Sequence, residues 1–176
     1  MKNLWVGGLA TIVALVTLLI AAPPGPAAPT APAAPADGTF QVVARPLIGF
    51  DEVPPVSTVG RGTFRATVTA TSIEYELTYN NLEGTASAAH IHFGQRWVSG
   101  GVAAFLCGGG DKPPCPPSGT VTGTIDAADV IGPATQGIAA GEFVELRRAI
   151  RAGVTYVNVH SDLFPGGEIR WQIERY

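Results

Sequence analysis

Short runs in which apolar and polar residues alternate recur from residue 40 to the end of the chain. In residues 72–79 every second residue is isoleucine, leucine or tyrosine, and residues 168–174 alternate with isoleucine and tryptophan. Because side chains alternate sides along a β-strand, this pattern predicts strands with one buried face. Helical spacing is clear in residues 142–152, before Gly153, which is placed to end a helix. The expected strands are residues 40–47, 63–70, 72–79, 86–92, 102–107, 119–125, 154–160 and 168–174.

This pattern predicts an all-β fold, because the helix content is too low for an α/β fold. Eight short strands at close spacing are typical of a Greek-key β-sandwich or barrel. We therefore expect an eight-stranded Greek-key sandwich or barrel with one short helix.

The N-terminal residues predict export. Residues 1–22 begin with Lys2 and continue as an uncharged, almost wholly apolar run of about 19 residues. This length suits a cleaved signal peptide or an uncleaved membrane anchor. Residues 23–37 are nearly all proline and alanine, which predicts an extended linker. Residues 38–176 then form one domain outside the cytoplasm, either secreted or anchored through the N-terminal segment.

The charge of the chain gives no support for nucleic-acid binding. The formal net charge is −3 and no run of basic residues is present, whereas nucleic-acid-binding domains carry a basic stripe. We therefore expect no nucleic-acid partner, and contact with a membrane only through the N-terminal segment if it is retained.

The two cysteines predict a disulfide. Cys107 and Cys115 flank a loop of glycine and proline, and an even pair in an exported protein is typical of a disulfide bond. A metal site would need closer spacing or more cysteines. The bond would limit the freedom of this loop in the unfolded chain.

The three histidines are the strongest candidates for chemistry. His90 and His92 are two residues apart in an expected strand, so their imidazoles project from the same face, roughly 6–7 Å apart at the backbone. His160 ends another expected strand and shares its face with Asn158 and Tyr156. Neutral imidazole is a common ligand of copper and zinc, so three of them with an open position suit either metal. The alternative is a hydrogen-bonded histidine pair beside a turn, without metal.

A fourth metal ligand is not supplied by histidine, because no further histidine is present. Water, a carboxylate or no ligand at all remain open for that position. Glu168 and Arg170 share a strand face and can pair, or Glu168 can orient a histidine. Glu52 precedes a rigid, apolar segment that could form a rim of the site. The candidate supporting residues or fourth ligands are Glu52, Asn158, Asp162, Glu168 and Arg170.

Common catalytic motifs are missing from the sequence. It contains no G-x-S-x-G motif, no H-E-x-x-H motif and no glycine-rich loop that opens a helix, which argues against the corresponding hydrolases and nucleotide-binding enzymes. We expect no catalytic residues from these classes, and enzymatic activity stays open.

Four segments together resemble a known family. Residues 52–56, 89–92, 156–160 and 165–170 read EVPPV, AHIH, YVNVH and PGGEIR. In this order they resemble the CHRD domain, which is named from chordin and is widespread in bacterial exported proteins. The resemblance spans about residues 39–173. It implies an extracytoplasmic domain with a cysteine pair in a loop, and it implies little about activity.

Two of these segments are also similar to the copper-ligand strands of copper/zinc superoxide dismutase, an eight-stranded Greek-key barrel with a loop disulfide. This likeness implies a superoxide-dismutase-like fold and copper at His90, His92 and His160, with zinc as the alternative. The bridging histidine, the zinc ligands and the catalytic arginine of that enzyme have no identifiable counterpart. Three functions therefore remain: a CHRD domain that binds copper, a metal-free module that binds another extracellular protein, and a copper oxidoreductase.

Overall fold

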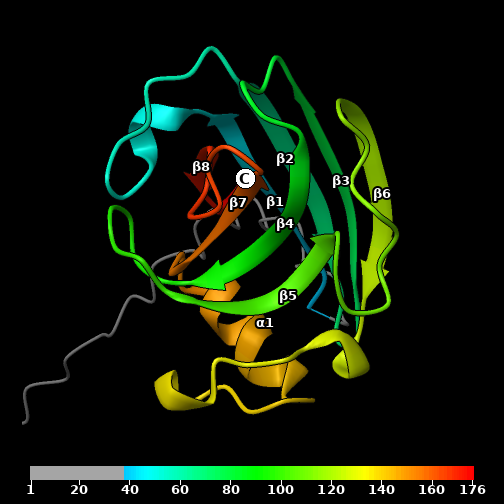
Figure 1. Ribbon diagram of the computed structural model, residues 1–176. Helices are drawn as coiled ribbons and strands as arrows, with labels where there is room; N and C mark the ends of the chain where they lie inside the picture. The colour runs from blue at the N-terminus through cyan, green and yellow to red at the C-terminus, as the bar shows by residue number, and fades with distance from the viewer. Residues whose placement is uncertain (1–37) are drawn as a thin grey trace, which may run out of the picture. The chain divides into compact units, whose positions relative to one another are not determined.

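The computed structural model describes residues 38–176, which form two antiparallel β-sheets with one α-helix (Figure 1). The predicted leader, residues 1–22, and the predicted linker, residues 23–37, lie outside the described residues. Within residues 38–176, no helix is both long enough and apolar enough to cross a membrane.

The first sheet has five strands in the order β6-β3-β2-β1-β9. Its outer surface is polar, because buried residues in strands β2 and β3 alternate with exposed or half-buried ones. The pairing of β1 with β2 shifts in register between Ala44 and Leu47. The strands are β1 (Phe40–Leu47), β2 (Arg61–Val68), β3 (Ile73–Asn80), β6 (Gly119–Ile125) and β9 (Glu174–Arg175).

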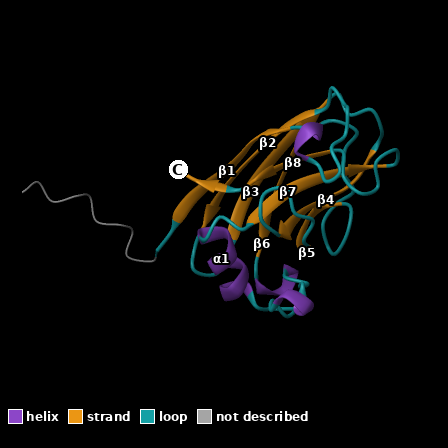
Figure 2. Ribbon diagram, turned by 90° about the vertical axis from the view of Figure 1, so that its left-hand side faces the viewer, coloured by secondary structure: helices purple, strands orange, loops and turns teal. Residues whose placement is uncertain are grey.

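The second sheet has four strands in the order β5-β4-β7-β8. Neither β3 and β6 nor β4 and β7 are consecutive in the chain, yet each pair is hydrogen-bonded, so the connections are of the Greek-key type. Figure 2 shows the two sheets packed face to face. The strands are β4 (Ala86–Phe93), β5 (Gly101–Cys107), β7 (Thr155–Ser161) and β8 (Ile169–Gln172).

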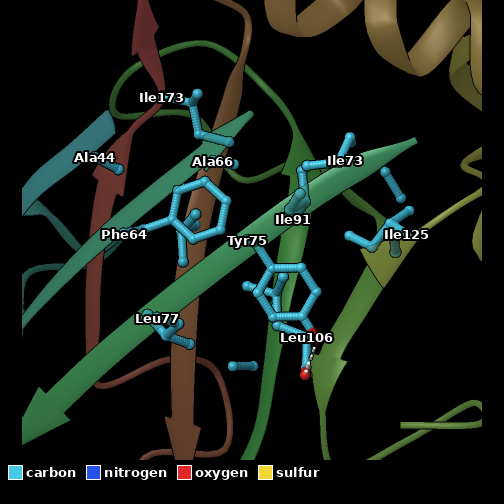
Figure 3. Packing of buried hydrophobic residues seen from close by; sticks show 14 of the residues in the cluster. Ala44, Phe64, Ala66, Ile73, Tyr75, Leu77, Ile91, Leu106, Ile125 and Ile173 are labelled. Carbon is cyan, nitrogen blue, oxygen red and sulfur yellow. Dashed lines mark hydrogen bonds between the residues drawn. The ribbon is translucent and has the colours of Figure 1, made fainter. Parts of the chain in front are cut away.

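The hydrophobic core fills the space between the sheets (Figure 3). Phe64, Tyr75 and Leu77 of the first sheet point toward Ile91 and Leu106 of the second, and all five are at least 95% buried. The Tyr75 hydroxyl donates a hydrogen bond of 2.7 Å to the carbonyl of Leu106. Burial of these alternate apolar side chains is the main force that holds the two sheets together.

Helix α1 (Phe143–Arg151) covers one end of the sandwich (Figure 1). It buries Phe143, Leu146 and Ile150 at helical spacing and exposes its polar face. Gly153 follows with φ of +70°, a conformation that favours glycine and ends the helix.

The predicted all-β fold with one short helix is confirmed, and each of the eight expected strands has a counterpart. The last expected strand, residues 168–174, divides into β8 and β9, which belong to different sheets. Among the described residues, the only β-bridge between the two sheets is the isolated one between Ile48 and Arg170. The fold is therefore a sandwich and not a closed barrel. Two further features were not expected as strands or helices: β9 itself and the 3-10 helices at Gly49–Asp51, Ala127–Asp129 and Ala134–Gln136.

The predicted disulfide between Cys107 and Cys115 is also confirmed, with the two Cα atoms 5.0 Å apart. Cys107 ends strand β5, so the bond fastens the loop that follows to the edge of the second sheet. The loop is further held by Lys112, whose ammonium donates to Asp129 at 2.6 Å.

Candidate metal centre

The three histidines meet on the outer face of the four-stranded sheet. His90 and His92 lie on β4 and His160 on the neighbouring strand β7. As the alternation predicts, Ala89 and Ile91 point the other way into the core and are fully buried. The imidazoles are themselves only 6–9% exposed, because loops cover this face of the sheet.

The three imidazoles bring their nitrogen atoms close together. One nitrogen from each lies within 4.8 Å of the others, and His90 Nδ1 is 3.0 Å from His160 Nε2. Two ligands with bonds of about 2.0–2.1 Å to one metal ion lie roughly 2.8–4.2 Å apart, depending on the angle between them. The His90–His160 pair lies within this range, whereas the 4.8 Å bound for the whole group exceeds it. The three histidines therefore lie close together, and their rings would have to approach further to share one ion.

Backbone carbonyls determine which nitrogen of two histidines carries the proton. His92 Nδ1 lies 3.0 Å from the carbonyl of Gly100, and His160 Nδ1 lies 3.0 Å from the carbonyl of Pro165. Because a carbonyl oxygen only accepts, each Nδ1 is the donor. The lone pair of each neutral ring is then on Nε2, as in a metal-ligating histidine whose other nitrogen is held by a carbonyl.

Burial keeps the histidines neutral. It lowers the pKa of His90 from 6.5 to about 3, with a smaller contribution from the charges of His160 and His92. Burial likewise lowers the pKa of His92 to about 4 and that of His160 below its usual value. At neutral pH all three rings therefore hold a lone pair that a metal ion can use.

Aromatic side chains fix the ring planes. Tyr156 stacks on His92 with 4.8 Å between ring centroids and 4° between planes, and Phe105 contacts His90 edge-on at 4.6 Å. The amide of Gly100 donates to the Tyr156 hydroxyl at 3.1 Å, so one residue of the loop holds both Tyr156 and His92. The guanidinium of Arg170 also lies over the ring of Tyr156, 3.6 Å from its centroid.

Sequence reasoning placed Tyr156 on the correct face but assigned it no role. The contributions of Gly100, Pro165 and Phe105 were missed altogether. Backbone carbonyls leave no signature in a sequence, but Phe105 could have been found, because it pairs with His90 once β4 and β5 are recognised as neighbours.

Glu52 and Asn158 lie together beside the cluster. Asn158 is opposite His90 in the β4–β7 register, and its amide donates to Glu52 at 3.4 Å. Glu52 is 4% exposed, and burial raises its pKa from 4.5 to about 8, although the charge of Arg170 opposes this shift. Among the described residues, Glu52 Oε1 and Asn158 Oδ1 have no hydrogen-bond partner.

The remaining predicted carboxylates are engaged elsewhere. Glu168 is fully buried and accepts hydrogen bonds from the hydroxyls of Thr58 at 2.8 Å and Ser161 at 2.6 Å. Asp162 accepts from the amide of Thr85 at 2.7 Å. Among the described residues, the group able to share one ion consists of the three histidines alone.

Comparison with known proteins yields one family. The family model of the CHRD domain matches residues 43–173, a span that includes the three histidines and both cysteines. No curated protein and no solved structure matches the chain.

Proposed function

This chain belongs to the CHRD domain family, and we propose that it is an extracytoplasmic member that binds one metal ion, copper in preference to zinc, through His90, His92 and His160. The observation that carries the proposal is the convergence of one nitrogen from each ring within 4.8 Å. The disulfide and the apolar N-terminal run support a location outside the cytoplasm, because disulfides persist in oxidising compartments.

The hydrogen bonds suggest which atoms would be ligands. His92 and His160 would use Nε2, because their Nδ1 protons are engaged by carbonyls. His90 would use Nδ1, the atom that faces His160 Nε2 at 3.0 Å. Without metal, His90 Nδ1–H donates to His160 Nε2, so metal binding would replace this hydrogen bond and move the proton of His90 to its Nε2.

The donor set favours copper. Three imidazole nitrogens without a thiolate or carboxylate suit copper and zinc better than magnesium or calcium, which prefer oxygen ligands. For a given nitrogen site, divalent copper binds more tightly than zinc. Arg170 is a cation, and the raised pKa of Glu52 keeps that carboxyl neutral. Neither residue therefore adds a negative charge that would favour magnesium or calcium.

Calorimetric titration of the full chain with Cu(II) and Zn(II) tests the proposal. We expect one equivalent of copper to bind, and His92→Ala or His160→Ala to weaken binding by about 100-fold or more, because removal of a supporting group alone costs 10–100-fold. Gln95→Ala, an exposed polar residue of the neighbouring loop, is the matched control. Copper affinity that is unchanged in all the histidine variants would refute the proposal.

A metal-free interaction module is the second candidate, and the direct His90–His160 hydrogen bond favours it. In that case the histidines only support the sheet, and copper would leave the unfolding temperature unchanged. A copper oxidoreductase needs an ion that substrate can reach, and imidazoles only 6–9% exposed make this function the least favoured of the three.

A further inference from the structure

Three arginine side chains gather around one aromatic ring at the start of β1. The guanidiniums of Arg147, Arg151 and Arg175 lie 5.5, 4.9 and 5.1 Å from the ring centroid of Phe40. Arg147 and Arg151 come from helix α1 and Arg175 from strand β9. No basic run in the sequence reveals this cluster, because the fold assembles it from distant segments.

None of these three arginines forms an ion pair with a carboxylate of residues 38–176. The hydrogen bonds of Arg147 and Arg151 go to neutral backbone carbonyls. Arg147 donates to Thr69 and Gly38, both at 2.7 Å, and Arg151 donates to Gly38 at 2.9 Å. Since each guanidinium is within 5.5 Å of the same centroid, all three are within about 11 Å of one another, a range over which salt screens repulsion only in part.

The acidic residues closest in sequence do not balance this charge. Glu145 is engaged by Arg148 at 3.0 Å, and Glu174 is next to Arg175 on a strand, so the two side chains project to opposite faces. Asp37 precedes Gly38 and lies outside the described residues. Even with Asp37 and the α-carboxylate of Tyr176 counted, three cations leave a positive excess of one in a chain whose formal net charge is −3.

The cluster is accessible at one end of the sandwich. Arg151 and Arg175 are exposed, and the following Tyr176 is 78% exposed. Figure 2 shows helix α1, the start of β1 and the C-terminus at the same end. Exposed arginine beside an exposed tyrosine is the combination that occurs where proteins meet the headgroup region of a bilayer.

We propose that this arginine surface, formed by Arg147, Arg151 and Arg175 with Tyr176, docks the domain on anionic phospholipid headgroups. Guanidinium groups suit phosphate because they can donate two parallel hydrogen bonds to it. The proposal concerns a surface separate from the histidine cluster and does not depend on metal binding.

The position of the surface along the chain selects a lipid partner. Both Arg147 and Arg151 donate to Gly38, the residue at which the preceding 37 residues join the domain. Those residues include the apolar run of residues 4–22, and about 20 apolar residues are enough to span a bilayer. If a bilayer holds this run, residues 23–37 tether the arginine surface to the same membrane.

Partition of the full chain onto vesicles tests the proposal. The partition coefficient is measured on phosphatidylcholine vesicles with phosphatidylglycerol and on the same vesicles without it, and the first value is divided by the second. Binding through the apolar run contributes to both coefficients and therefore cancels in this ratio. We expect the ratio to exceed one and to fall with salt. Arg151→Gln with Arg175→Gln should lower it by about thirtyfold, since each basic side chain near an anionic surface contributes about fivefold. Arg147 is left in place because it holds two carbonyls.

The matched control carries the same change of charge near the end of β1 and the start of β2, Arg45→Gln with Arg61→Gln, and should retain most of the ratio. A ratio of one, or an equal loss in both double variants, would overturn the proposal. A ratio abolished by inorganic phosphate at constant ionic strength would assign the surface to a free phosphate ester and overturn the lipid assignment. Thermal unfolding of both variants near that of the parent shows that the comparison concerns folded protein.

Discussion

Replacement of Glu52 by glutamine should stabilise the protein, and the gain should grow as the pH rises. Glu52 is 4% exposed, and burial raises its pKa from 4.5 to about 8. Between these values the folded protein keeps a proton that the unfolded chain has lost. The stability contributed by this proton is therefore fully present below about pH 4.5, declines with rising pH and is lost above about pH 8.

The magnitude follows from the shift in pKa. At 1.36 kcal/mol per unit, a folded-state pKa of about 8 makes Glu52 cost about 4–5 kcal/mol at pH 9 but less than about 1 kcal/mol at pH 5. Glutamine keeps the shape and can still accept from Asn158, but it does not ionise. The stability difference between Glu52→Gln and the parent should thus rise by about 4 kcal/mol from pH 5 to pH 9, or roughly 10–15 °C in unfolding temperature.

Urea unfolding of the metal-free proteins at several pH values measures this difference. The histidines titrate equally in both proteins, so their effect cancels in the comparison. Glu174→Gln, at an exposed position, is the matched control and should show a small, nearly constant difference. A Glu52→Gln difference that is flat or that shrinks with pH would mean that Glu52 is ionised beside Arg170 in the folded protein, and the reasoning from burial would be refuted.

Two further predictions concern the histidines and the disulfide. In metal-free Glu52→Gln, the free energy of unfolding should fall by about 4 kcal/mol between pH 8 and pH 5. The pKa values of His90 and His92 are lowered in the folded protein, so only the unfolded chain takes up protons at these residues below pH 6.5. Urea unfolding that is independent of pH would contradict this prediction. Cys107→Ala with Cys115→Ala should cost about 2.5 kcal/mol from the entropy of the freed loop, and an unchanged unfolding temperature would argue against that contribution.

The strands could be predicted because alternation of apolar and polar residues indicates a strand with one buried face. Residues 72–79 were expected as a strand and β3 spans Ile73–Asn80. The end of the chain shows the limit of the pattern, because the alternation continues without a break through Ile173. The Ile173 amide still donates to the carbonyl of Thr155 in the second sheet, and the chain then crosses to the first sheet. Pairing between sheets depends on long-range packing, which a local pattern does not encode.

The histidine site could be predicted only in part for the same reason. The shared face of His90 and His92 follows from their spacing alone. Their meeting with His160 depends on the pairing of β4 with β7, which no local signal determines. The likeness to the copper-ligand strands of superoxide dismutase supplied that expectation. The carbonyls of Gly100 and Pro165, which orient two of the rings, come from loop conformations and could not be derived from residue types.

The distribution of unsatisfied polar groups distinguishes the site from the rest of the fold. Among the described residues, six buried side-chain atoms have no hydrogen-bond partner, and all but the one on Thr155 belong to residues on, or packed against, the outer face of the four-stranded sheet near the histidines. A buried polar atom that stays without a partner costs about 1–3 kcal/mol, so a bound partner at this face would add stability. Of these atoms, His92 Nε2 is the one that the proposed metal ion would satisfy directly. The orphaned atoms are Glu52 Oε1, His90 Nε2, His92 Nε2, Asn158 Oδ1, Gln172 Oε1 and Thr155 Oγ1.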